Sequence, residues 1–353
     1  MVEGDLLKFL DKRFKGDIFY TTIFPGKPVG GLTLSRETIP LDWTPIPNTT
    51  LAIALLEIGV LTPHTSIDWR VKVNGINVTK EFKPIATAPL GDKLYAKHVF
   101  DITSILKLPE SMKKNRVNVT FKREGGDIIT IEHISLITLF ESEEAESVIK
   151  YYSGASSLEP GEKIKYGIGY DDKSAVFRTT FYIPSTLAQM LIRIGEDYSV
   201  EIRNIQGMNE ETHRLSLSNG INDVEYYHID TGEKYAPKEI SLSNILVYNT
   251  KYVQPDIVIE EINLPSEAEK EAIAKIRIVN KGESKPDKLL VTVMTRGEVL
   301  KVKEIEPLEP GREAEVEIPI KQPPGEYTLI FRVIWKKLTQ TWFKEERREI
   351  VIK

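Results

Sequence analysis

Short stretches of alternating apolar and polar residues run along most of this chain, and turn signals separate them. Residues 69–73 are followed by Asn74-Gly75, a strong hairpin signal, because both positions of a tight type I′ turn need positive φ. Further runs of this kind cover residues 98–102, 115–122 and 128–140. Strands separated by short turns are typical of an antiparallel sandwich or jelly roll, which we expect over residues 17–143.

The N-terminal residues carry a different pattern. Four apolar residues between positions 4 and 15 recur at helical spacing: Leu6, Leu7, Leu10 and Phe14. This spacing predicts a short amphipathic helix. We expect it to pack across an open end of the first sandwich, with a partner-binding arm as the alternative. Residues 101–106 are expected to form a helical turn.

Residues 150–253 show the same alternation and turn signals as the first segment, and two of their stretches are similar to it in sequence. Six of the ten residues 50–59 are identical to residues 186–195, and Ile-Ser-Leu occurs at both 134–136 and 240–242. Two matches in the same order favour duplication of one sandwich. Chance likeness between buried strands of similar composition is the alternative.

A third unit begins near Pro255. Its Leu-Glu-Pro-Gly turn at residues 308–311 leads into a run in which apolar residues alternate with glutamates, the pattern of a half-buried strand. The sequence therefore predicts an all-β protein: two jelly-roll-like β-sandwiches, related by internal duplication, followed by an immunoglobulin-like β-sandwich. The predicted domains are residues 1–148, which include the N-terminal helix, 149–253 and 254–353, joined by short linkers at 143–149 and 252–255.

Four phrases of the third unit carry a resemblance to a known family: Pro255-Asp256-Ile257, Val279-Asn280-Lys281-Gly282, Leu308-Glu309-Pro310-Gly311 and Pro324-Gly325-Glu326-Tyr327. The unit resembles the adhesion-related immunoglobulin-like domains called CARDB, which recur in surface proteins of archaea and bacteria. The resemblance covers about 100 of the 353 residues. It implies an extracellular spacer or adhesion module and brings no catalytic site with it.

Composition narrows the possible functions. The chain has no cysteine, which excludes disulfides, thiolate zinc sites, iron-sulfur clusters and cysteine nucleophiles. Its net charge of -5 argues against a nucleic-acid partner, because phosphate contacts need a strongly basic face. No apolar run approaches the roughly 20 residues that span a bilayer, so we expect no membrane span in this chain. The preference for Glu, Lys and Ile is a thermophile tendency.

The sequence contains no recognisable catalytic or metal-binding motif. The five histidines never lie at the spacing of a metal pair, and no nucleophile elbow or phosphate loop occurs. Asp171 and Asp172 could hold calcium on a loop, but a solvated hairpin tip is the favoured interpretation. A pair of glycosidase carboxylates is not excluded, since the two groups come together in the fold and need no fixed spacing in the sequence. We therefore expect no catalytic residue, no metal, no cofactor and no enzymatic activity.

Two sets of residues are candidates for contacts with glycans. Trp43, Trp69, Tyr226 and Tyr227 could form a sugar platform if exposed, and are equally natural as core residues. Three Asn-x-Thr acceptor sequons, at Asn48, Asn77 and Asn118, all fall in the first predicted domain. If the chain faces the outside of a cell, they could carry glycans.

The sequence thus favours a non-enzymatic structural or adhesion protein of a cell surface, of thermophilic archaeal type, located outside the cell. Its expected partners are copies of itself, other surface or virion proteins, and glycans. Contacts would use loops or sheet edges. One alternative is a virion structural protein, a capsid or turret component with duplicated jelly rolls. The other is a set of carbohydrate-binding modules of a glycan-processing system.

Overall fold

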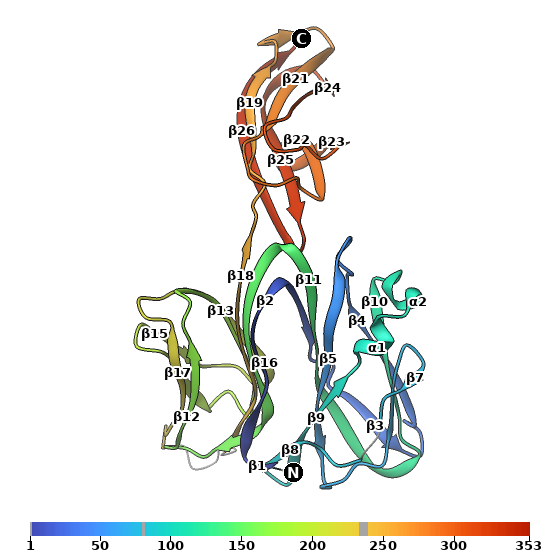
Figure 1. The fold of residues 1–353 in the computed structure, drawn as a ribbon, viewed down its shortest axis with the longest axis vertical. Coiled ribbons are helices and arrows are strands. Elements are labelled where there is room, and N and C mark those ends of the chain that lie inside the picture. Colours follow the sequence, from blue (N-terminus) through green and yellow to red (C-terminus); the bar gives the residue numbers. More distant parts are fainter. Residues whose placement is uncertain (1, 80–81, 233–238) are drawn as a thin grey trace. The chain divides into compact units, whose positions relative to one another are not determined.

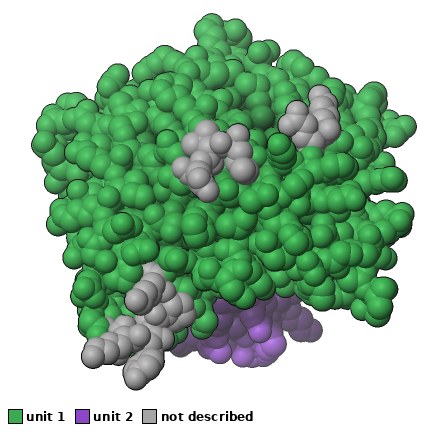
Figure 2. Space-filling view, turned by 90° about the horizontal axis from the view of Figure 1, so that it is seen from below, with its two compact units in different colours: residues 1–251 green, residues 252–353 purple. Residues whose placement is uncertain are grey.

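The computed structural model describes residues 2–79, 82–232 and 239–353, and these ranges are built almost entirely of strands. This confirms the all-β prediction. The chain divides into two compact units, residues 1–251 and 252–353 (Figure 2). Among the described residues, no helix has the length and apolar character needed to cross a membrane.

Unit 1 holds two sandwiches that share one long strand. The first contains β1 (Val2–Glu3), β2 (Asp5–Ile23), β3 (Lys27–Gly31), β4 (Arg36–Asp42), β5 (Thr50–Thr62), β6 (Arg70–Val73), β7 (Ile76–Asn77), β8 (Ala86–Leu90), β9 (Lys93–Asp101), α1 (Thr103–Leu106), α2 (Pro109–Met112) and β10 (Arg116–Lys122). The shared strand is β11 (Gly125–Leu158). The second contains β12 (Lys163–Tyr170), β13 (Ser174–Ile183), β14 (Gln189–Ile194), β15 (Tyr198–Ile202), β16 (Gly207–Ser216), β17 (Ile221–Ile229) and β18 (Ile240–Tyr252).

The sheets of unit 1 form four layers (Figure 1). The outer layers are the four-stranded sheets β4-β10-β6-β7 and β12-β17-β14-β15. The inner layers are two halves of one large sheet, in the order β1-β8-β9-β5-β11-β18-β13-β16. A separate apolar core packs the halves together and includes Leu55, Ile137, Tyr151 and Leu246. The linker predicted at residues 143–149 is wrong, because these residues continue β11 from one sandwich into the other.

The large sheet folds over along the ribbon of β2 and β11, which arches through the middle of unit 1 (Figure 1). The antiparallel ladder jumps from the Glu141–Gly16 pair to the Glu146–Lys15 pair. Gly16 has φ of 148°, and a Cβ atom there would lie 2.0 Å from the backbone oxygen of Phe140. Only glycine fits at this position of the fold.

We expect Gly16→Ala to lower the free energy of unfolding of unit 1 by about 2 to 3 kcal/mol, because the new Cβ collides with backbone and the φ angle is strained. Urea unfolding followed by circular dichroism measures the loss. Gly167→Ala is the matched control, since no heavy atom lies within 4 Å of its added Cβ. Equal losses in the two variants would contradict this account of the ribbon.

The helix predicted for residues 4–15 is wrong, because these residues belong to strand β2. Spacings of four residues fit a strand as well as a helix. A bulge in β2, opposite Tyr151 and Tyr152, breaks the alternation, so that Leu6 and Leu10 point to different sides. Leu6 joins the core of the second sandwich and Leu10 the core between the half-sheets. Long-range pairing with β11 therefore overrides the local helical preference.

Two local predictions are confirmed. Asn74 and Gly75 have φ of 50° and 89° and connect β6 to β7, as a type I′ hairpin requires. The expected helical turn near residues 101–106 is α1. Its first residue, Thr103, accepts a hydrogen bond from the backbone N–H of Ala54 at 2.8 Å, which ties the turn to β5.

The two sandwiches of unit 1 have the same strand order. The outer sheet β4-β10-β6-β7 corresponds to β12-β17-β14-β15, and the inner strands β9-β5-β11 correspond to β16-β13-β18. The Ile-Ser-Leu echo at residues 134–136 and 240–242 lies on the corresponding strands β11 and β18. The longer echo is wrong as an alignment, because residues 50–59 lie on β5 and residues 186–195 on and beside β14.

Unit 2 is a sandwich of two sheets, β19-β21-β24 and β20-β26-β25-β22-β23. Its strands are β19 (Ile257–Asn263), β20 (Glu267–Ala268), β21 (Glu271–Asn280), β22 (Lys288–Thr295), β23 (Glu298–Ile305), β24 (Glu313–Lys321), β25 (Gly325–Lys337) and β26 (Gln340–Ile352). The buried side chain of Asn280 joins several turns. Its amide donates to the carbonyl of Leu308 at 2.8 Å, and its oxygen accepts from the N–H of Asp256 at 3.2 Å. The first three phrases behind the CARDB resemblance therefore meet at one residue.

Candidate functional site

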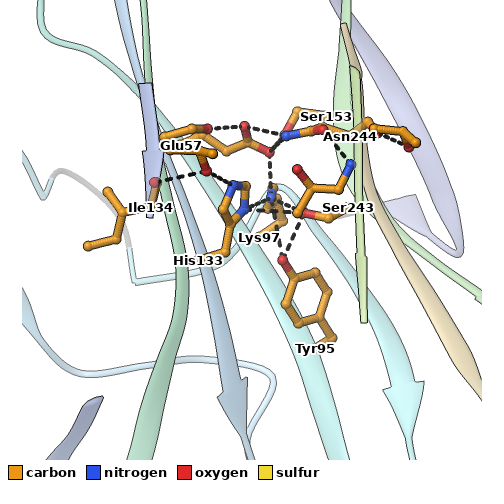
Figure 3. Close-up of polar contacts among 12 residues, drawn as sticks. Glu57, Tyr95, Lys97, His133, Ile134, Ser153, Ser243 and Asn244 are labelled. Atoms are coloured by element: carbon orange, nitrogen blue, oxygen red, sulfur yellow. Dashed lines mark hydrogen bonds and ion pairs between the residues drawn. The ribbon is translucent and has the colours of Figure 1, made fainter. Parts of the chain in front are cut away.

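A group of buried titratable and polar side chains lies where the two half-sheets of unit 1 face each other (Figure 3). We call it the interlayer cluster. Its members from the first sandwich are Glu57 on β5, Tyr95 and Lys97 on β9, and His133 and Ser135 on β11. Its members from the second are Ser153 on the later part of β11, and Ser243 and Asn244 on β18. All are buried.

The carboxylate of Glu57 is the acceptor at the centre of the interlayer cluster. The hydroxyls of Ser135 and Ser153 donate to it at 2.6 and 2.9 Å. The Asn244 amide donates to both of its oxygens, at 2.9 and 3.2 Å. The side-chain oxygen Oδ1 of Asn244 accepts the backbone N–H of Thr180 at 3.0 Å. Glu57 thus links β5 to β11 and β18 through charge-assisted hydrogen bonds.

Lys97 and Glu57 form a salt bridge in which neither side chain is exposed. Burial raises the pKa of the Glu57 carboxyl, but Lys97, His133 and the hydroxyl donors outweigh it and lower the pKa to about 2. Burial also lowers the pKa of Lys97, against the attraction of Glu57. We assign the charged pair, because a protonated carboxyl would point its own O–H at groups that already donate.

The hydrogen bond from Lys97 also fixes the tautomer of His133. Its ammonium lies 3.0 Å from Nδ1 of the ring, and Nε2 lies 3.2 Å from the hydroxyl of Thr22. An ammonium only donates, so Nδ1 accepts and Nε2 carries the proton. Burial and the Lys97 charge, opposed by Glu57, lower the pKa of His133 to about 3. The histidine is therefore neutral at physiological pH.

A serine next to a lysine and a carboxylate can act as a nucleophile when a substrate reaches it. The Lys97 ammonium donates to Ser243, whose hydroxyl also lies 2.8 Å from that of Tyr95. Gly59 leaves the space for this contact, because its Cβ would lie 2.1 Å from the Tyr95 hydroxyl. The side chains of Ser243, Lys97 and Glu57 have no exposed area. Their chemistry is to hold the half-sheets together.

The sequence interpretation missed this cluster, although the signal was present. Glu57 stands inside the apolar run of residues 51–61, and Lys97 stands in the middle of β9, between the buried Ala96 and His98. A lone charge in a buried run needs a partner. The pairing itself could not be deduced, because the partners lie on different strands.

A cleft of about 490 Å³ opens between the two sandwiches, within the range of small-molecule sites. Its lining includes Leu61, Leu90, Asp92, Lys93, Tyr182 and Glu239. The carboxylate of Glu239 accepts the backbone N–H of Gly91 at 2.6 Å, which ties the β8–β9 hairpin to the second sandwich. Burial raises the pKa of Tyr182, and the charge of Glu132 adds to this rise.

The aromatic residues proposed as a sugar platform do not form one. Trp43, Trp69 and Tyr226 are buried, so the alternative of core packing holds for them. The Trp69 ring stacks on Phe121 with centroids 5.6 Å apart. Tyr227 is half-buried, and the Lys163 ammonium lies 5.1 Å from its ring centroid. These residues lie in separate sandwiches and share no surface.

One of the two aspartates considered for calcium has other partners. Asp172 lies 3.7 Å from the guanidinium of Arg13 and 3.4 Å from the ammonium of Lys251. Among the described residues, no three His, Asp or Glu side chains gather as a metal ion requires. Three of the histidines, His98, His133 and His228, are buried.

All three sequon asparagines have exposed side chains. Asn77 lies on β7 and Asn118 on β10, both in the outer sheet of the first sandwich, and Asn48 lies in the turn between β4 and β5. The structure therefore gathers sequons that are spread over 73 residues of sequence, from 48 to 120, onto one sandwich.

Comparison with known proteins gives likenesses of structure only. No protein-family model matches the sequence, and no curated protein does. The CARDB domain of a Pyrococcus furiosus protein, solved in complex with di-metal ions, is 17% identical, covers 28% of this chain and 89% of that one, and has a TM-score of 0.24.

Two glycosidases are similar to a larger part of the chain. A GH2 β-galacturonidase from Eisenbergiella tayi bound to glycerol is 11% identical and covers 59% of this chain, with a TM-score of 0.23. A Bacteroides uniformis β-glucuronidase is 13% identical and covers 58%, also with a TM-score of 0.23. The matches span 35% and 26% of these enzymes. At such TM-scores none of the three likenesses supports a function, and the CARDB resemblance of unit 2 stays a prediction.

Proposed function

We propose that this protein is a non-enzymatic structural or adhesion protein of a cell surface. Unit 1 is a rigid double-sandwich block, and unit 2 is a spacer or adhesion module. The strongest support is the burial of the interlayer cluster: Glu57, Lys97 and Ser243 have no exposed area. An enzyme keeps such groups within reach of its substrate, whereas a building block uses them internally to fix two sandwiches.

Assembly contacts of such a block would use free sheet edges. Strand β23 ends its sheet in unit 2 and pairs with β22 alone among the described strands. Val299 and Val302 on β23 are 57% and 52% exposed. An edge strand offers unpaired backbone groups to a second strand, and exposed valines add apolar contact. We assign β23 as the self-association edge.

Electron microscopy and mass photometry of the purified full chain test this function. We expect oligomers or filaments, and we expect Val299→Lys with Val302→Lys to abolish them, because charges on an edge oppose strand pairing. Ile273→Lys is the matched control: Ile273 is 52% exposed but lies on β21, in the middle of its sheet. A chain that stays monomeric at all concentrations would overturn the proposal, and closed shells would favour the virion alternative.

Glycan binding is a second candidate, favoured by the cleft between the sandwiches. Its aromatic Tyr182, apolar Leu61 and Leu90, and charged Asp92 and Lys93 supply the stacking surface and hydrogen-bond partners that a sugar needs. Tyr182→Ala is expected to remove binding on a glycan array. Tyr227→Ala lies outside the cleft and should leave binding unchanged, and equal loss in both variants would reject the cleft as the site.

A further inference from the structure

The outer sheet of the first sandwich has one buried face and one face that carries sequon residues. On β10 the side chains of Val117 and Val119 are buried, and Asn118 between them is exposed. Successive residues of a strand point to opposite faces. Asn118 and the threonine of its sequon, Thr120, therefore share the outer face.

A second sequon lies on the same face. Thr120 pairs with Lys72 on β6, and Lys72 pairs with Asn77 on β7. Directly paired residues of neighbouring strands project from the same side of a sheet. Asn77 and Asn118 thus both project from the outer face of β4-β10-β6-β7, with Lys72 between them. Asn77 and Asn118 are 41 residues apart in the sequence, and the fold brings them onto one face of one sheet.

The third sequon lies in the connection from the outer-sheet strand β4 to the inner-sheet strand β5. Asn48 occupies an exposed turn with φ of 58°, soon after β4. The hydroxyl of Thr49 donates to the carbonyl of Ile46 at 2.7 Å, which fixes the turn, and Thr50 of the sequon is exposed. The second sandwich and unit 2 contain no sequon.

We propose that Asn48, Asn77 and Asn118 are N-glycosylation sites, and that the glycans on Asn77 and Asn118 cover the outer face of the sheet β4-β10-β6-β7. This inference rests on the proposed location outside the cell. The donor is a lipid-phosphate-linked oligosaccharide. Nδ2 of each asparagine forms a bond to the anomeric carbon, the bond from that carbon to the phosphate oxygen breaks, the lipid phosphate leaves with the electron pair, and the amide loses one proton to a base.

The glycans keep this face of the sheet from making assembly contacts, whereas the β23 edge makes them. Each glycan is a bulky hydrated group, and two of them stand on one face of the sheet, on strands β7 and β10 with β6 between them. Protein partners are therefore excluded from the outer face of the first sandwich. Assembly contacts are left to other surfaces, among them β23.

The test uses the full chain, tagged at its C-terminus and produced in its own cells, with separate recovery from the envelope and from the cytoplasm. Mass spectrometry of the intact chain and of its peptides reads each site. We expect glycopeptides at all three sequons. Asn118→Gln and Thr120→Ala should each remove one glycan, and Thr120→Ser should keep it, because serine preserves the sequon. Asn115→Gln, an exposed asparagine outside any sequon, should change nothing.

The outcomes separate this inference from the proposed function. Envelope-bound chain with three unmodified sequons would overturn the glycan sites and leave the surface function standing. Chain found only in the cytoplasm would overturn the surface function and the glycan sites with it. Glycans at all three sites, without assembly at β23, would support the sites and reject the proposed edge.

Discussion

Replacing Lys97 with methionine is expected to lower the free energy of unfolding of unit 1 by about 3 to 5 kcal/mol, because it leaves the buried carboxylate of Glu57 without its counter-charge. The Glu57–Lys97 pair has no exposed area. Methionine keeps most of the side-chain volume, so the loss reports charge rather than packing. Urea unfolding measures it, and a transition of unit 2 should stay in place as an internal reference.

A double-mutant cycle separates the pair from its surroundings. We expect Glu57→Gln with Lys97→Met to be markedly less destabilised than the sum of the single variants, because neither charge is left alone. The control is Lys165→Met, which breaks the exposed pair with Asp223 and should cost little stability. A loss of the same small size for Lys97→Met would show that the interlayer cluster does not hold the half-sheets together.

Acid is expected to destabilise unit 1 from about pH 6.5 downwards, through two buried neutral histidines. Burial first, and the Lys97 charge second, lower the pKa of His98 to about 4, and the same two causes lower the pKa of His133 to about 3. Below pH 6.5 the unfolded chain takes up these protons and the folded chain does not. Each histidine therefore removes about 1.4 kcal/mol of stability per pH unit until its folded pKa is reached.

Glu57 adds to the acid loss at lower pH. Its pKa falls from 4.5 to about 2 on folding, so the stability it contributes is complete above pH 4.5 and is lost between about pH 4.5 and 2. Urea unfolding at pH 7.5, 6.5, 5.5 and 4.5 measures the histidine part alone. We expect His133→Gln to reduce the slope, since glutamine can keep both hydrogen bonds without titrating. His98 and His228, whose pKa values burial also lowers, keep the remainder of the slope.

His64→Gln is the matched control for the pH dependence. The side chain of His64 is 49% exposed and lies outside the interlayer cluster, so this variant controls for the substitution itself. An unchanged slope in His133→Gln would place the acid sensitivity elsewhere. An unchanged free energy of unfolding between pH 7.5 and 4.5 in the parent chain would contradict neutral burial of both histidines.

Local turn chemistry could be predicted from the sequence because a few residues decide it. Asn74-Gly75 specified its hairpin through positive φ, and residues 101–106 formed their helical turn where expected. The first residues show the limit of this reasoning. Leu6 and Leu10 fit a helix and a strand equally, and only the presence of β11, more than a hundred residues later, selects the strand.

The candidate site could not be predicted from the sequence, again because its residues come from strands that are distant in the chain. Glu57, Lys97 and Ser243 lie on three strands, and nothing in their local patterns says that these strands meet. The sequons were visible as motifs, but only the strand register shows that Asn77 and Asn118 share a face. In contrast, exposure of Trp43 and Trp69 was left open by the sequence and decided by packing.

The sequence by itself determined that this is an all-β protein with sandwiches, because alternation and turn residues act within a few positions. The tertiary structure decided that two sandwiches share β11 and fold face to face at Gly16, and that a lone glutamate and a lone lysine neutralise each other between the layers. These features depend on pairing between distant strands, and the free energy of that pairing comes from burial and partners that no local pattern records.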